Sequence, residues 1–123
     1  MNKVIAEITT EQNSVVHGDH HIITTVALKD GVGPFDAGTL LFKGESGYEP
    51  LTKSDETNTA TAVAYDNLEN KAASAVLNVV VHGVVRGEKL LLADKSLASE
   101  DLREDLRNVG IYAIGKMAES AGA

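Results

Sequence analysis

Residues 26–50, VALKDGVGPFDAGTLLFKGESGYEP, decide the fold of this chain. In this stretch, short apolar segments alternate with glycine-containing turns, a pattern typical of β-strands joined by tight loops. We expect a turn at Asp30-Gly31, a strand over 38–42 and a second turn over 44–47. No polar cluster suited to catalysis interrupts these segments, so the stretch predicts a β-rich scaffold.

Two later stretches, 61–92 and 102–115, continue this pattern. We expect strands over 61–65 and 75–81, joined by a polar connection. The second of these strands is largely apolar on both faces, which predicts the most buried strand of the sheet. One face consists of Leu77, Val79 and Val81, and the other of Val76, Asn78, Val80 and His82. The glycines at 83 and 87 then predict a sharp bend.

One short helix is expected near 99–109. Ser99 is a favourable N-cap residue, and acidic residues follow it at the positive end of the helix dipole. Apolar residues then recur at steps of four and three, and Gly110 suits a left-handed stop. The apolar stripe consists of Leu102, Leu106 and Val109. A closing strand over 111–114 and a frayed tail complete a fold that is mainly β, or α+β by content.

Size and composition predict a single domain with an aliphatic core. The chain has 123 residues, of which only 4% are aromatic, so Val, Leu, Ile and Ala must fill the interior. Because each of these side chains buries little area, such a domain gains stability by associating with other subunits.

Charge and residue usage exclude several classes of function. The net charge is −7 and no cluster of Lys and Arg exists, so we expect no binding to nucleic acid or to an anionic membrane. The chain lacks cysteine, which excludes disulfides and thiolate metal ligands. No apolar run is long enough to span a bilayer and no leader is recognisable, so we expect a soluble protein made in the cytoplasm.

The N-terminal segment differs from the rest of the chain. Residues 1–17 contain apolar side chains but no turn or cap that would anchor them, so we interpret them as an extended arm. Residues 18–123 then form the single domain. The apolar residues of the arm are Val4, Ile5, Ile8, Val15 and Val16.

The sequence concentrates metal-ligating side chains in His17-Gly18-Asp19-His20-His21. Imidazole nitrogens bind zinc and nickel, which makes His17, His20 and His21 the candidate ligands. In an extended segment, however, His20 and His21 point to opposite faces. We therefore expect a polar segment that enters the first strand, and no metal site.

Two other groupings contain catalytic residue types. Ser14, His17 and Asp19 lie close together in sequence, whereas the members of a hydrolytic triad normally come from distant segments. The acidic residues of the predicted helix interleave with arginines, which is typical of a solvated face. No glycine-rich phosphate loop occurs. We expect neither enzymatic activity nor a cofactor.

A carrier domain is the alternative interpretation. Residues 81–91, VHGVVRGEKLL, place glycines around a bend in the way that biotinyl and lipoyl carrier domains do. Such a domain presents its lysine at a tight hairpin tip, usually between methionines. The nearest match is Lys116-Met117, which follows the last predicted strand. This alternative, or another small β-barrel binding domain, stays open.

In their order and spacing, these blocks resemble the head decoration proteins of tailed bacteriophages, of the lambda gpD type. The resemblance runs from about Gly18 to Gly115, and it lies in the succession of blocks rather than in any one of them. His82 stands where the family has an aliphatic or charged residue. The matching blocks are GPFDAGTLL at 33–41, GYEP at 47–50, TAVAYDNLENKAAS at 61–74, VLNVVVHGVVRGEKL at 76–90 and LREDLRNVGIYA at 102–113.

The resemblance implies a β-clip fold, in which a bent ribbon closes into a partial barrel at its ends. It also implies a homotrimer that binds the major capsid protein at three-fold and quasi-three-fold sites on the outer surface of the expanded head. There it stabilises the shell against the pressure of packaged DNA, after being made in the bacterial cytoplasm. We expect the arm to contact the capsid protein through Val4, Ile5, Ile8, Val15 and Val16.

Overall fold

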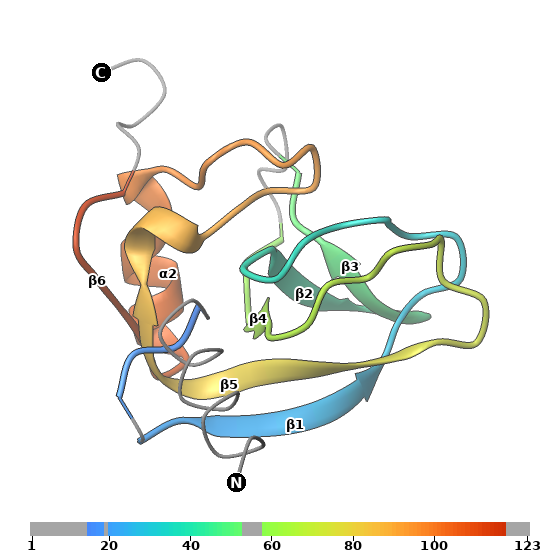
Figure 1. Ribbon diagram of the computed structural model, residues 1–123, viewed down its shortest axis with the longest axis horizontal. Coiled ribbons are helices and arrows are strands. Elements are labelled where there is room, and N and C mark those ends of the chain that lie inside the picture. The colour runs from blue at the N-terminus through green and yellow to red at the C-terminus, as the bar shows by residue number, and fades with distance from the viewer. Residues whose placement is uncertain (1–14, 19, 53–57, 118–123) are drawn as a thin grey trace, which may run out of the picture.

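The computed structural model describes residues 15–18, 20–52 and 58–117 and is mainly β with one short α-helix (Figure 1). Its six-stranded sheet has the order β1-β5-β4-β2-β3, and β6 pairs with β5 outside this path. All pairs are antiparallel except β5–β6, which is parallel. The predicted fold class is confirmed. The elements are β1 Ile22–Ala27, β2 Leu40–Gly44, β3 Gly47–Pro50, β4 Ala62–Ala64, β5 Val76–Arg86, α2 Arg103–Asn108 and β6 Ile111–Ile114.

The turns predicted from residues 26–50 are present. Gly44 pairs with Gly47, so β2 and β3 form a hairpin around a two-residue loop, Glu45-Ser46. The turn at Asp30-Gly31 is held by the loop after β4, because the Gly31 N–H donates to the Ala72 carbonyl at 2.8 Å. The loop after β1 and the loop after β4 therefore run side by side at one end of the molecule (Figure 1).

β5 is central but is not the most buried strand. Leu77, Val79 and Val80 are buried as expected, whereas Val76 is 64% exposed. β4 pairs with β5 only at two positions, Val63↔Val80 and Ala64↔Val79, so nothing in β4 extends far enough to cover the first residues of β5. Every residue of the short β4 is buried, so β4 and not β5 is the most buried strand.

The predicted bend after Gly83 takes the form of a continuous, curved strand. β5 pairs with β1 as far as Ile22↔His82 and then pairs with β6 from Gly83 onward, with a bulge between Ile22 and Ile23 (Figure 1). A Cβ atom at Gly83 would lie 2.6 Å from the Cα atom of His21. A glycine is needed here because the chain entering β1 passes directly against β5.

The core consists of two apolar clusters, one on each face of the sheet. Successive residues of a strand point to opposite faces, so Leu40 packs in one cluster and Leu41 in the other. In the same way, Val80 and Val79 of β5 fall in different clusters. β2 and β4 are thus covered on both faces, which explains their unbroken apolar sequence.

The helix is shorter than predicted and begins differently. A 3₁₀ turn at Glu100–Leu102 precedes α2, and the Ser99 side chain makes no capping hydrogen bond. Leu106 is fully buried, but Val109 is 37% exposed, so only part of the predicted stripe reaches the core. Gly110, with φ +90°, ends the helix in the left-handed conformation as expected.

Both ends of the described domain differ from the prediction. Val15 and Val16 are buried, and the segment pairs with β5: the Arg86 N–H donates to the Val15 carbonyl at 2.7 Å. The boundary at residue 17 is therefore wrong, because residues 15–17 belong to the folded domain. Met117 is also buried in the core, so the chain stays packed beyond β6.

Candidate functional site

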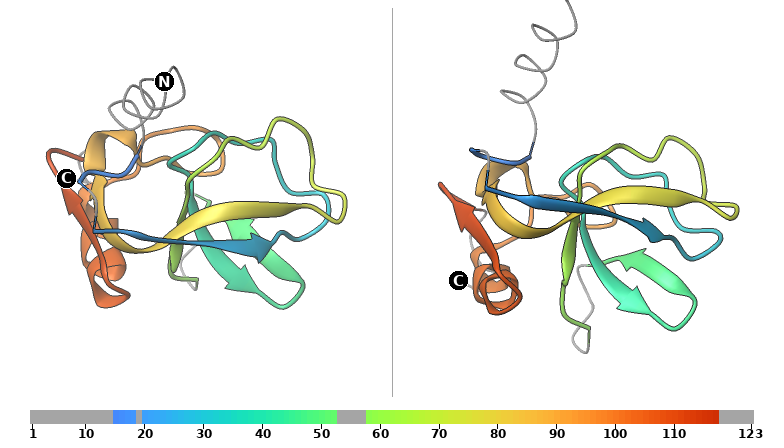
Figure 2. Two further views of the ribbon diagram at one scale, coloured as in Figure 1. Left: turned by 60° about the horizontal axis from the view of Figure 1, so that its bottom comes forward. Right: turned by 90° about the horizontal axis from the view of Figure 1, so that it is seen from below.

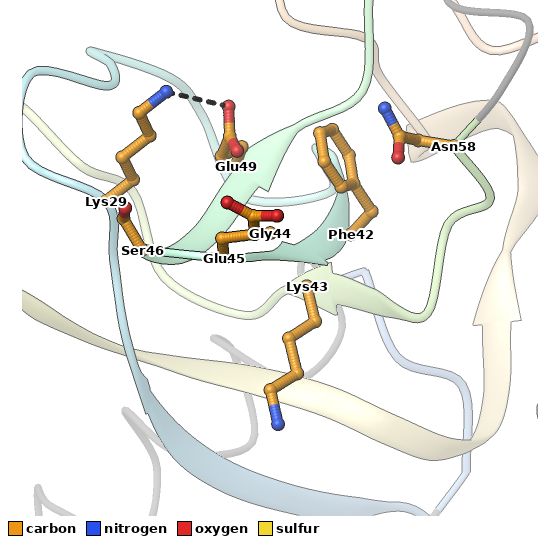
Figure 3. A pocket seen from close by; sticks show the side chains of 8 residues that line it. All are labelled: Lys29, Phe42, Lys43, Gly44, Glu45, Ser46, Glu49 and Asn58. Atoms are coloured by element: carbon orange, nitrogen blue, oxygen red, sulfur yellow. Dashed lines mark ion pairs between the residues drawn. The ribbon is translucent and has the colours of Figure 1, made fainter.

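A hollow of about 430 Å³ lies beside the β2–β3 hairpin (Figure 3). The side chains of Lys29 and Glu49 point toward one another across it, with Nζ and Oε1 3.5 Å apart, while Lys43 points away from them (Figure 3). The lining includes one hydroxyl, from Ser46, and no imidazole that would activate it. It is lined by Lys29, Phe42, Lys43, Gly44, Glu45, Ser46, Glu49 and Asn58. We find no catalytic arrangement in this hollow.

The histidine segment does not form a metal centre in the part of the chain that the structure describes. His17 and His20 are exposed and His21 is partly buried where it crosses Gly83. Among the described residues, no group of three or more His, Asp or Glu side chains is placed to hold a metal ion. Asp19 lies outside the described residues, as does Ser14, so the Ser14-His17-Asp19 grouping is not described.

The predicted capsid contacts divide into two groups. Val4, Ile5 and Ile8 lie outside the described residues. Val15 and Val16 are only 2% and 1% exposed. Their side chains pack in the core, although the sequence pattern predicted a free apolar arm. Val15 and Val16 therefore do not lie on the predicted contact surface.

The arrangement that a carrier domain requires is absent at Lys116. The lysine follows the end of β6, and the next residue, Met117, is buried in the core. The two-residue hairpin at Glu45-Ser46 contains no lysine. Neither position presents a lysine at the tip of a tight hairpin.

The strongest polar cluster of the described chain joins α2 to the end of β6. The Arg103 guanidinium donates from Nε and Nη2 to the two oxygens of Glu100, each at 2.7 Å. It also donates to two backbone carbonyls, those of Ala113 and Gly115, the latter at 2.8 Å. A bidentate pair of this kind fixes the orientation of the guanidinium. We call this group the Arg103 clasp: Glu100, Arg103 and the carbonyls of Ala113 and Gly115.

The clasp lowers the pKa of the Glu100 carboxyl group. The hydrogen bonds from Arg103 favour the ionised form and lower the pKa of Glu100 from 4.5 to about 2. The same bonds raise the pKa of Arg103. By contrast, Arg107 and Glu104 on the next turn are both exposed and lie 3.8 Å apart. Such a pair contributes little to stability.

An exposed apolar face lies on the outer side of β5 and β6. In the parallel register Val84 lies beside Tyr112 and Arg86 beside Ile114, so these four side chains share one face. Tyr112 is 46% and Ile114 40% exposed. The His82 ring meets Tyr112 edge to face, with centroids 6.4 Å apart. We call this surface the β6 face: Ile22, His82, Val84, Arg86, Tyr112 and Ile114.

Sequence reasoning anticipated the elements of these two features but not their roles. Glu100 and Arg103 are three residues apart, a spacing that brings side chains together on a helical turn. We interpreted them as part of a solvated face because nothing local indicates that Arg103 reaches β6. The alternation in Ile111–Ile114 shows which residues share a side of the strand, but not that one side stays uncovered.

No protein-family model matches this chain, and no curated protein sequence matches it either. No helix within the described ranges is long and apolar enough to cross a membrane.

Proposed function

We propose that this protein is a structural component of a bacteriophage head. It binds as a homotrimer to the major capsid protein on the outer surface of the expanded shell, at three-fold and quasi-three-fold sites. There it clamps neighbouring capsomers and resists the outward pressure of the packaged DNA. It acts mechanically and not as an enzyme, and it needs no cofactor.

The observation that carries this proposal is the succession of blocks that resembles phage decoration proteins. These blocks follow one another along a single small domain: 33–41 leads into β2, 47–50 is β3, 61–74 begins with β4, and 76–90 contains β5. The last block, 102–113, spans α2 and most of β6. A curved strand such as β5 is also what a β-clip ribbon requires. These features support the proposed function, although a fold by itself does not determine a function.

The proposed attachment uses the residues before Val15. Residues 15–17 pair with β5 through hydrogen bonds from Arg86 N–H to Val15 O and from His17 N–H to Val84 O. A segment that precedes them is therefore joined to the sheet through a fixed anchor. In a trimer, three such segments act together, so that avidity replaces the strength of a single site. An extended segment can add to a strand edge of the capsid protein.

The negative charge agrees with a position outside the shell. With a net charge of −7, the chain gains nothing by approaching DNA, whose phosphates would repel it. A protein on the outer surface has no such contact to make.

A truncation tests the attachment. Removing residues 1–13 leaves Val15 and Val16 in the core, so the variant should keep its fold, measured by circular dichroism and by its urea midpoint. We expect it to lose binding to expanded heads of the encoding phage that lack this protein, in a sedimentation assay. Unimpaired binding would remove residues 1–13 from the mechanism. Failure of the full-length protein to bind would refute the proposed function itself.

A substitution series separates side-chain contact from segment length. Replacing Val4, Ile5 and Ile8 together by Ser should weaken attachment as the truncation does. The matched control replaces Thr9 and Thr10 by Ser, which preserves length and polarity, and should bind heads normally. Equal binding of the two variants would contradict an apolar contact in this segment.

A further inference from the structure

We propose that the β6 face is the docking site for residues 1–8 of the same chain, which lie outside the described residues. The inference begins from where apolar side chains remain exposed. Six large apolar side chains of the described residues are exposed, and three of them, Ile22, Tyr112 and Ile114, belong to this face. Exposed apolar residues that gather in one place indicate a contact surface.

The N-terminal segment leaves the domain beside this face. Val15 lies on one edge of β5, where its carbonyl accepts from the Arg86 N–H, and β6 lies on the other edge, where Arg86 is in register with Ile114 (Figures 1 and 2). Val15 is therefore two strand spacings, about 10 Å, from Ile114. Ile8 precedes Val15 by seven residues. Such a length spans about 24 Å when extended and about 10 Å as a helix, so the segment reaches the face in either conformation.

The composition of the segment fits an apolar surface. Its large aliphatic residues, Val4, Ile5 and Ile8, fall within five positions and can contact a single patch. Residues 9–14, TTEQNS, are all polar and suit a solvent-exposed connection back to the domain. The segment at the other end of the chain, 118–123, has the sequence AESAGA and no large apolar side chain. The N-terminal segment is therefore the occupant with the matching chemistry.

Covalent attachment favours this segment over a separate molecule. A short connection gives a tethered group an effective concentration on the order of millimolar. A contact too weak to hold a separate molecule at micromolar concentration is therefore occupied by the tethered one. The strand edge next to the face is not used, because the Arg103 guanidinium occupies the carbonyls of Ala113 and Gly115. The segment packs onto the side chains of the β6 face instead.

The experiment uses the full-length chain with one nitroxide spin label. The chain contains no cysteine, so Lys3→Cys gives a single point of attachment. The label should broaden the amide NMR signals of Tyr112 and Ile114 and leave that of Val76, at the other end of β5, unchanged. Signals of Tyr112 and Ile114 that keep their full intensity would overturn the proposal.

A substitution series in the labelled chain separates docking from mere tethering. Replacing Val4, Ile5 and Ile8 together by Ser keeps the length of the segment but removes the apolar contact, so both broadened signals should recover most of their intensity. The matched control, Thr9→Ser with Thr10→Ser, should leave them as broad as in the parent labelled chain. Equal intensities in the two variants would show that broadening reflects the tether alone, and would overturn the proposal.

A mixed sample distinguishes docking within one chain from docking on a second copy. Isotope-labelled chain without the nitroxide is combined with nitroxide-labelled chain that carries no isotope. Any broadening then comes from the segment of one copy on the face of another. We expect the signals of Tyr112 and Ile114 to keep their intensity in this sample. Broadening as strong as in the singly labelled chain would overturn docking within one chain.

The consequence for attachment to phage heads rests on the proposed function. The same three apolar residues would have to leave the β6 face before they contact the capsid protein. Tyr112→Ser with Ile114→Ser should therefore bind heads at least about twofold more tightly than the wild type, which corresponds to docking in half of the molecules or more. Equal or weaker binding would overturn this competition. If the nitroxide shows docking but the full-length chain does not bind heads, the proposed function fails while this inference stands.

Discussion

The Arg103 clasp permits a sharp test of how the C-terminal part of the domain is held. The perturbation is Arg103→Gln, which keeps a polar side chain of good helix propensity but removes the charge and the fork of donors. The variant leaves the Glu100 carboxylate without its bidentate partner. It also leaves the carbonyls of Ala113 and Gly115 without the donors that they have in the native protein.

The expected magnitude follows from these four hydrogen bonds. Hydrogen bonds to charged groups contribute roughly 1.5–3 kcal/mol each when they are well buried. The Arg103 side chain is 32% exposed, so water replaces a large part of what is lost. We therefore expect the free energy of unfolding to fall by about 2 kcal/mol in total, which for a domain of this size lowers Tm by roughly 8 °C.

The assay is urea unfolding followed by circular dichroism, with Arg107→Gln as the matched control. Arg107 is the same residue type on the same helix, but its exposed pair with Glu104 is 3.8 Å long. Its replacement should cost less than about 0.5 kcal/mol. Amide hydrogen exchange should also accelerate at residues 111–115 in the Arg103 variant alone. Equal losses of stability in the two variants would refute the reasoning.

Three further predictions concern the same domain. The pKa of Glu100 is lowered from 4.5 to about 2 in the folded state. Its contribution to the free energy of unfolding is therefore fully present above about pH 4.5 and is lost as the pH falls toward 2. Urea midpoints across this range should fall less steeply in Glu100→Gln than in the wild type. Gly83→Ala should lower Tm more than Gly31→Ala, because the added Cβ meets a backbone atom at 2.6 Å at position 83 and open space at position 31. Equal Tm values for the two variants would contradict this. Leu106→Ala should cost about 2–5 kcal/mol by cavity formation, and Val109→Ala, measured in the same chemical denaturation, less than half as much.

The features that sequence reasoning predicted correctly are those set by neighbouring residues. The β2–β3 hairpin follows from glycines at its two ends and from apolar runs on either side. The end of the helix at Gly110 follows from the conformational freedom of that residue. In both cases, the physical cause lies within a few positions along the chain.

The features that it missed depend on which segments meet in space. Val76 looked like a core residue, but β4 is too short to cover it. Val15 and Val16 looked like part of an arm, but β5 offers a free edge beside them. Arg103 looked solvated because its acceptors, ten and twelve residues away, belong to another element. Sequence alone contains no local signal for any of these pairings.

The pairing of residues 15–17 with β5 bears on how the proposed attachment can be tested. The same residues of β5, 84–86, contact the N-terminal segment on one edge and β6 on the other. A force applied to the residues before Val15 would therefore act on the strand that supports the β6 face. Removing Val15 and Val16 along with the residues before them would disturb the core as well as the proposed attachment, and a truncation that ends at residue 13 is therefore needed to tell the two effects apart.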